Sequence, residues 1–379
     1  MRRLMLVLAC LLLCSLSVAG PVAAGSATGP AAEPRGGSRH AAESPVPLLA
    51  YYYQWFDPGS WQRAKTDLPH LGPYSSDDTT VMRQQIVWAK SAGIDGFIVS
   101  WKDSPVNDRR LEKLIKVAEA ENFRLAMIYQ GLDFSRRPLP TDRVAEDFRT
   151  FRDRFAQSPA FLRLGGKPLT VWSGTWKFSE ADVARVTSAV RDDLLVLSTE
   201  KSVSGYRRIA DVTDGLAYYW SSVNPGTNRG YEDKLGDLSR AVHGDGKYWV
   251  APFAPGFDAR PVGGTSTVPR EDGRTLRAEY SAAVRSSPDV LGLISWNEFS
   301  ENTHVEPSRN YGFRYLDELR DLRTTPAPDA PADSGDEEAA GSGDVPAWQW
   351  QVPAAAVSAA VVVGAVVRRR HSVRRGSER

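Results

Sequence analysis

The sequence predicts an α/β protein with a single (β/α)8 TIM barrel over residues 46–323. Three observations support this fold. Eight short apolar runs alternate with eight segments of helical periodicity, each run precedes its helix, and the region is about 280 residues long, a typical size for such a barrel. An open doubly wound sheet is the alternative. It is less favoured because no Gly-x-Gly-x-x-Gly motif follows the first apolar run.

The apolar runs have the length and composition of buried parallel strands. They lie at residues 47–54, 94–101, 124–130, 168–173, 194–199, 214–220, 247–254 and 290–296. The first helical segment, residues 79–93, places Met82, Ile86 and Ala89 on one face and has a stop signal at Gly93. Further helices are expected at residues 108–122, 143–156, 179–191, 204–210, 231–242, 272–286 and 311–322.

The amino-terminal residues predict a secretory signal over residues 1–24. Arg2 and Arg3 precede an apolar run that ends in small residues. The two cysteines, Cys10 and Cys14, both lie in this signal, and residues 25–45 are expected to be a flexible segment. A lipoprotein anchored through one of these cysteines is a less favoured alternative, since no small-residue motif precedes either of them.

The carboxyl-terminal residues predict a membrane anchor. Residues 324–346 form an acidic linker rich in Pro and Ala, which is expected to be disordered. Residues 347–367 carry no charge and have the length of one transmembrane helix, and residues 368–379 form a basic tail typical of a cytoplasmic face. We therefore expect a single-pass protein of the cell membrane whose barrel is extracellular.

Charge and residue usage exclude several classes of function. Six arginines and one glutamate lie in the last twelve residues, so the rest of the chain is mildly acidic although the whole carries a net charge of +1. A nucleic-acid partner is therefore not expected. Five scattered histidines and no cysteine after the signal predict no metal site, and no cofactor is expected. We expect a monomer.

Aromatic and polar residues gather where the predicted strands end. Five of the eleven tryptophans fall there, namely Trp55, Trp101, Trp172, Trp220 and Trp296. Function in a TIM barrel lies at the carboxyl ends of the strands. Several aromatic rings at one rim suit the faces of sugars, which offer C–H bonds for stacking and hydroxyls for hydrogen bonding.

Two glutamates follow the last predicted strand in the sequence SWNEFSE, residues 295–301. Glu298 and Glu301 stand three residues apart, with Asn297 beside them, at the expected mouth of the barrel. A lone loop glutamate is usually just solvated. Two of them in an aromatic cleft are the groups that hydrolyse glycosides, where one carboxyl protonates the leaving oxygen and another acts at the anomeric side.

At these residues the chain resembles glycoside hydrolase family 99, the endo-α-mannosidases and endo-α-mannanases, within a wider group that includes family 71. The resemblance covers roughly residues 48–319 and rests on the stretches YYYQWF, LGPYSSDD, GIDGFIVSW, DGLAYYW, PGFDAR and SWNEFSENTHVEPSRNYGFRYL. It implies that Glu298 removes the proton of the substrate's 2-hydroxyl, which then forms a 1,2-anhydro sugar. It also implies that Glu301 serves as acid and then as base, in a retaining, endo-acting reaction on an α-linked polysaccharide or oligosaccharide, mannan first and glucan second.

The resemblance also implies substrate-binding positions. These are Tyr53, Trp55, Trp101, Gln130, Tyr219, Arg260, Trp296 and Asn297. Two departures concern the substrate. Gln130 stands where the family has a glutamate, which exchanges an acceptor for an amide, and Phe299-Ser300 replaces a histidine between the catalytic glutamates.

Two other functions remain open at this point. The barrel could be a carbohydrate-binding module that has lost turnover, or a membrane-associated factor in the assembly of a cell-surface polysaccharide. Retention of both glutamates favours the glycosidase.

Overall fold

The computed structural model of the protein describes residues 46–324. The predicted signal, flexible segment, transmembrane helix and basic tail lie outside these residues. The predicted linker also lies outside them, except for Thr324, which is the last residue of the final helix. Within residues 46–324, no helix is both long and apolar enough to cross a membrane.

Eight parallel strands form the centre of the structure. They are β1 (Leu48–Tyr53), β2 (Gly96–Trp101), β3 (Arg124–Gln130), β5 (Lys167–Ser173), β6 (Leu195–Leu197), β7 (Gly215–Ala217), β8 (Tyr248–Phe253) and β11 (Val290–Leu293). Neighbours pair in the order β6-β5-β3-β2-β1-β11-β8-β7. The two ends meet at a parallel bridge between Ser198 and Leu216, where Ser198 N–H donates to the Gly215 carbonyl at 3.0 Å. The sheet is therefore closed, and the predicted barrel is confirmed.

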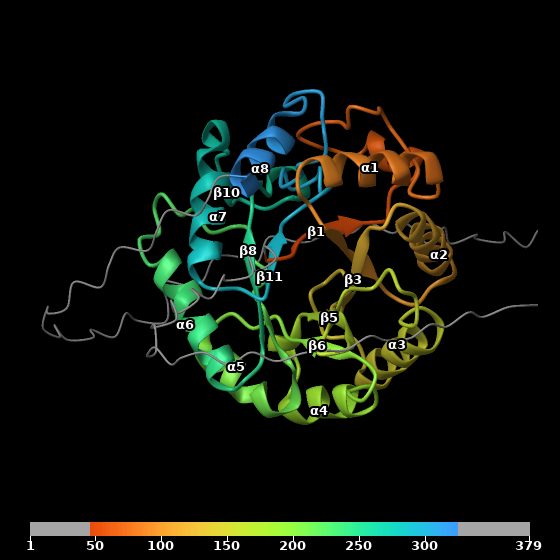
Figure 1. The fold of residues 1–379 in the computed structure, drawn as a ribbon, viewed down its shortest axis with the longest axis vertical. Helices are drawn as coiled ribbons and strands as arrows, with labels where there is room; N and C mark the ends of the chain where they lie inside the picture. The colour runs from red at the N-terminus through yellow and green to blue at the C-terminus, as the bar shows by residue number, and fades with distance from the viewer. Residues whose placement is uncertain (1–45, 325–379) are drawn as a thin grey trace, which may run out of the picture. The chain divides into compact units, whose positions relative to one another are not determined.

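Eight helices surround these strands in chain order (Figure 1). They are α1 (Thr79–Ser91), α2 (Pro105–Ala120), α3 (Thr141–Arg154), α4 (Glu180–Ser188), α5 (Val203–Ile209), α6 (Tyr231–Gly244), α7 (Arg274–Arg285) and α8 (Arg314–Thr324). Local signals set several of their ends. Asp78 caps α1 by accepting from Thr80 N–H at 2.8 Å, and Gly93, just past its end, has the left-handed φ of +76° that glycine adopts without strain.

The remaining elements are short. β4 (Arg163–Leu164) runs antiparallel to β5, and β9 (Phe257–Asp258) pairs with β10 (Thr267–Val268) in a small hairpin after β8. Single 3₁₀ turns occur at Pro58–Gln62, Thr175–Lys177, Ala210–Val212, Arg260–Val262 and Glu271–Gly273.

The core has two layers because side chains alternate along each strand. On β1, Leu49, Tyr51 and Tyr53 belong to the cluster inside the barrel. Their neighbours Ala50 and Tyr52 belong to the larger cluster between the sheet and the helices. The same alternation continues past the strand ends, so it decides which side chains reach the mouth of the barrel.

Candidate active site

A cavity of about 400 Å³ opens at the carboxyl ends of the strands. Its walls come from strand ends and from the loops after β1, β2, β3, β5, β7, β8 and β11. The lining includes Gln54, Trp55, Ser100, Gln130, Ser173, Trp176, Tyr219, Trp220 and Glu301. Its place and its mixture of aromatic and polar groups are those of a TIM-barrel substrate site.

The two predicted catalytic glutamates lie together in the loop after β11, and both are buried, with 4% of Glu298 and 6% of Glu301 exposed. Hydrogen bonds fix both the backbone and the side-chain carboxyl of Glu298. Its N–H donates to Ser295 Oγ at 2.9 Å, and its Oε1 accepts from Ser300 N–H at 2.9 Å. The Glu301 carbonyl accepts from Asp258 N–H at 2.7 Å, which ties this loop to the hairpin after β8.

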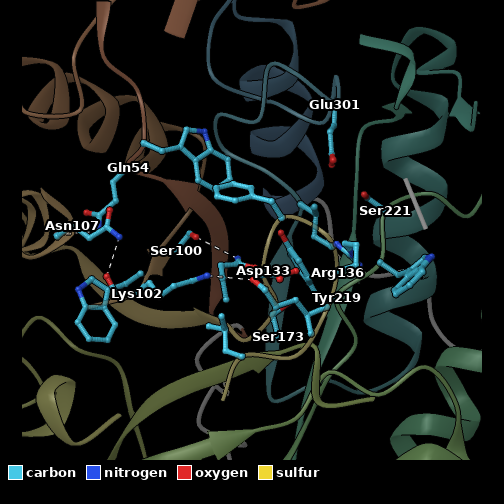
Figure 2. Close-up of a pocket in the computed structure, with 18 of the residues that line it drawn as sticks. Gln54, Ser100, Lys102, Asn107, Asp133, Arg136, Ser173, Tyr219, Ser221 and Glu301 are labelled. Carbon is cyan, nitrogen blue, oxygen red and sulfur yellow. Dashed lines mark hydrogen bonds between the residues drawn. The ribbon is translucent and has the colours of Figure 1, made fainter. Parts of the chain in front are cut away.

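The carboxyl of Glu301 points into the cavity, toward the side on which Tyr219 and Arg136 lie (Figure 2). Its Oε1 is buried and accepts no hydrogen bond from residues 46–324. A buried carboxyl oxygen without a donor favours the protonated acid over the anion. Glu301 is thus suited to donate a proton to an oxygen atom placed in the cavity.

The surroundings of the two glutamates give their carboxyl groups different pKa values. Burial raises the pKa of Glu298 to about 7, against the opposing effects of the Ser300 N–H and the Lys65 charge. Burial and then the charge of Glu298 raise the pKa of Glu301 well above its usual range, while Arg136 lowers it. Near neutral pH the pair therefore favours an ionised Glu298 beside a protonated Glu301. A base beside an acid is the combination that glycoside cleavage needs.

Two tyrosines stand beside this pair. The hydroxyls of Tyr53 and Tyr219 are hydrogen-bonded to each other, and the charges of both glutamates act on both phenols. Tyr219 lines the cavity, and Trp55 stacks on Tyr53 with ring centroids 4.2 Å apart. These three predicted residues, together with Gln130, are brought to the same site as Glu301. Gln130 Nε2 donates to Ser100 Oγ at 3.3 Å.

Asn297 is placed behind the site rather than in it. It is fully buried and holds the end of β1, because its Oδ1 accepts from Tyr53 N–H at 2.8 Å and its Nδ2 donates to the Tyr53 carbonyl at 2.9 Å. Nδ2 also lies 3.3 Å from the Tyr74 hydroxyl. It is not among the residues that line the cavity. Its role is to position Tyr53.

Three of the five rim tryptophans face the helices instead of the cavity. Trp101 and Trp172 occupy outward positions of β2 and β5, and Trp296 lies three residues after the end of β11. All three belong to the cluster between sheet and helices. Trp101 is among the residues that line the cavity, but it is buried, its ring packs against Phe151 and its indole N–H donates to Asp108 at 3.1 Å. The structure therefore does not support sugar stacking on the rings of Trp101 or Trp296.

Arg260 is also placed away from the cavity. Its side chain is 70% exposed and pairs with Asp258 at 2.6 Å. Neither residue lines the cavity, so the expected substrate contact of Arg260 has no support in this structure.

Several lining residues were not expected from the sequence. Ser100 and Ser173 hold the inward positions at the ends of β2 and β5. Trp176 comes from the loop after β5, and Arg136 comes from the loop after β3. Strand parity would have found the two serines, because they lie one residue from outward-facing tryptophans. Nothing in the sequence singles out Arg136. Within residues 46–324, no group of three histidine, cysteine or carboxylate side chains is arranged to hold a metal ion.

Comparison with known proteins places the chain in a family. Residues 61–325 match the model of Glycosyl hydrolase family 99. The glycoprotein endo-alpha-1,2-mannosidase of Rattus norvegicus is 22% identical over 274 residues, and the match covers 66% of this chain and 59% of the rat protein. The glycoprotein endo-alpha-1,2-mannosidase-like protein of Homo sapiens is 21% identical over 281 residues, and the match covers 66% of this chain and 60% of the human protein.

The solved structure of the GH99 endo-alpha-mannosidase from Bacteroides thetaiotaomicron superposes with a TM-score of 0.64 at 21% identity. That match covers 73% of this chain and 98% of the bacterial one, which supports the common fold. The chain thus spans about three fifths of the curated mammalian relatives. Since the family model matches well over half of the sequence, the chain belongs to glycosyl hydrolase family 99.

Proposed function

We propose that this protein is a retaining, endo-acting glycoside hydrolase that cuts α-linked mannose-containing glycans, with α-glucan as the second choice of substrate. One observation carries the proposal: two buried glutamates of unequal acidity stand at the mouth of the barrel, and the more weakly acidic one, Glu301, faces the cavity. Membership of the family and its likeness to endo-alpha-1,2-mannosidases support mannose as the sugar.

The proposed reaction assigns one proton transfer to each glutamate. Glu298, the more acidic of the two, takes in its ionised form the proton of the 2-hydroxyl, and O2 attacks the anomeric carbon while Glu301 protonates the departing oxygen. Glu301 then removes a proton from water, which opens the 1,2-anhydro ring, and Glu298 returns its proton to O2. Because the nucleophile belongs to the substrate, it is held close to the anomeric carbon and no protein nucleophile is required.

The substrate and the cleavage pattern can be tested together. Purified protein should release internal fragments with new reducing ends from an α-mannan, detected by mass spectrometry across a panel of α- and β-linked glycans. The variants Glu298→Gln and Glu301→Gln serve as controls for contaminating activity. Binding to mannan without release of fragments would contradict the proposal and leave a carbohydrate-binding barrel.

The nucleophile can be tested with an activated 2-fluoro glycoside. An enzyme carboxylate acting as nucleophile would form a glycosyl ester that fluorine stabilises, so a covalent adduct would accumulate. We expect intact-protein mass spectrometry to show no adduct, together with tight binding of a 1,2-anhydro sugar mimic. A stable adduct at Glu298 would replace the 2-hydroxyl mechanism by an ordinary double displacement.

We also propose, from the sequence, that the barrel is extracellular and attached to the cell membrane through residues 347–367, after removal of the signal.

A further inference from the structure

A tight loop after β3 presents one arginine to the cavity and keeps its neighbour away from it. Residues 131–140 fold back on themselves, with Asp133 N–H donating to the Arg137 carbonyl and Leu139 N–H to the Gly131 carbonyl, both at 2.9 Å. Arg136 has a left-handed backbone, φ +61°. Its side chain lines the cavity, and its guanidinium lies beside Tyr219 (Figure 2).

The acidic residue of this loop is already fully engaged. The Asp133 carboxylate accepts from Ser135 N–H, Arg137 N–H and Arg137 Nε, each at 2.9 Å. Because Arg137 occupies it, Asp133 does not neutralise Arg136. The Arg136 guanidinium makes no ion pair or side-chain hydrogen bond within residues 46–324. A half-buried cation with five donors is thus turned toward the cavity without a protein partner.

The wall next to Arg136 adds positive charge and aromatic surface. Trp176 and Trp220 line the cavity with their rings 5.8 Å apart, and Lys201 Nζ lies 4.6 Å from both ring centroids. Burial, and after it the charge of Arg136, lowers the pKa of Lys201, so the two cations are close in space. Glu301 faces the same region but burial favours its neutral form.

The other charged groups of the cavity offset each other. Lys102 and Asp103 are neighbours on the loop after β2, where Lys102 Nζ donates to the Leu132 carbonyl at 3.3 Å and Asp103 lies 4.0 Å from Arg143. The Arg136 side of the cavity therefore carries net positive charge, which a neutral sugar does not compensate. Guanidinium groups bind carboxylates and phosphates through paired donors.

We propose that the Arg136 side of the cavity binds an anionic substituent of the glycan, with the adjoining sugar ring stacked on Trp176 and Trp220. The substrate would then be an acidic glycan rather than a plain neutral one, carrying a carboxylate or a phosphate ester near the cleaved bond. This inference rests on the proposed glycosidase function and narrows its substrate class.

The test compares three matched oligosaccharides that differ in one substituent: a neutral sugar, its 6-phosphate and its uronic acid. For the parent protein we expect kcat/KM to be about tenfold or more higher on at least one anionic substrate than on the neutral one, the usual scale for one charge-assisted contact. The two anionic substrates distinguish phosphate from carboxylate. Added salt should reduce the preference by screening it.

Substitutions assign the preference to Arg136. Arg136→Gln should bring the anionic-to-neutral ratio of kcat/KM close to one, and Arg136→Lys should retain part of the preference because it keeps the charge. Arg240→Gln is the matched control, since its side chain is 74% exposed, pairs with Asp237 on α6 and does not line the cavity, and it should leave the ratio unchanged. Thermal unfolding of each variant confirms that it is folded.

Binding separates this inference from the proposed function. Calorimetry with Glu301→Gln measures affinity for the same three oligosaccharides without turnover. Tighter binding of an anionic one supports the inference even if the parent hydrolyses none of them. Equal parent kcat/KM on all three, or an equal loss on all three in Arg136→Gln, would overturn it, because Arg136 would then contact the common sugar or only support Glu301.

Discussion

Replacement of Asn297 should damage the fold before it affects substrate binding. Asn297→Ala removes the partner of the buried Tyr53 N–H and of the buried Tyr53 carbonyl, whereas the Tyr74 hydroxyl keeps its hydrogen bond to Glu306 at 2.9 Å. At about 1–3 kcal/mol for each of these two buried groups left unsatisfied, the expected loss in the free energy of unfolding is about 2–6 kcal/mol. Tyr53 would also lose its fixed position beside Glu298, so kcat should fall.

Asn297→Asp sharpens the test because it preserves shape. One carboxylate oxygen can still accept from Tyr53 N–H, but the other replaces a donor and faces the Tyr53 carbonyl. Two oxygens at that distance repel unless the carboxyl is protonated, so this variant should be less stable at pH 8 than at pH 5 relative to the parent. Urea unfolding at both pH values measures it. Parent-like stability with a raised KM would refute the structural role and restore Asn297 as a substrate contact.

Three further outcomes are expected. Burial raises the pKa of Glu306 from 4.5 to about 8, so folded protein holds a proton there that unfolded protein releases. The contribution of this proton to the free energy of unfolding is therefore complete below pH 4.5 and is lost as the pH rises toward 8. Between pH 5 and pH 7, the free energy of unfolding of Glu306→Gln, measured with urea, should rise by about 2–3 kcal/mol relative to that of the parent. Lys65→Met removes a charge that lowers the pKa of Glu298, so the ascending limb of the pH profile of kcat/KM should move to higher pH. If the limb does not move, a group other than Glu298 is responsible for it. A chain ended after Asp344 should be secreted as soluble, active protein, whereas retention in the membrane fraction would place the anchor in the signal region.

The order of elements could be predicted because it depends on local patterns. Alternating apolar runs and amphipathic helices located every barrel strand and all eight helices within a few residues. Among the strands, the largest deviations are three residues, in β7, predicted to 220 and ending at Ala217, and in the last strand, predicted to 296 and ending at Leu293. After Leu293 in the last strand, the chain still bonds to its neighbours through the Ile294 and Trp296 N–H groups, but between them Ser295 N–H donates to the Thr303 carbonyl of the returning loop at 2.9 Å. The hydrophobic periodicity of the sequence does not indicate that a strand end is hydrogen-bonded to a loop.

The site was harder to predict because it depends on which way each side chain points. Glu298 and Glu301 were accessible to sequence reasoning, since they follow the last strand. The rings of Trp101 and Trp296 were not placed correctly, because nearness to a strand end does not distinguish the cavity side from the helix side. Arg136 depends on a loop conformation set by Asp133, which no motif records.

The separate roles of the two glutamates are tested most directly by a comparison of leaving groups. The rates of Glu298→Gln and Glu301→Gln are measured on a natural glycoside and on one with an activated aryl leaving group. If Glu301 is the acid, Glu301→Gln should lose about two to four orders of magnitude on the natural glycoside and much less in the first step on the activated one, which needs little protonation. Glu298→Gln should lose activity on both. Parent-like activity of Glu301→Gln on the natural glycoside, or selective rescue of Glu298→Gln by the activated leaving group, would contradict the assignment.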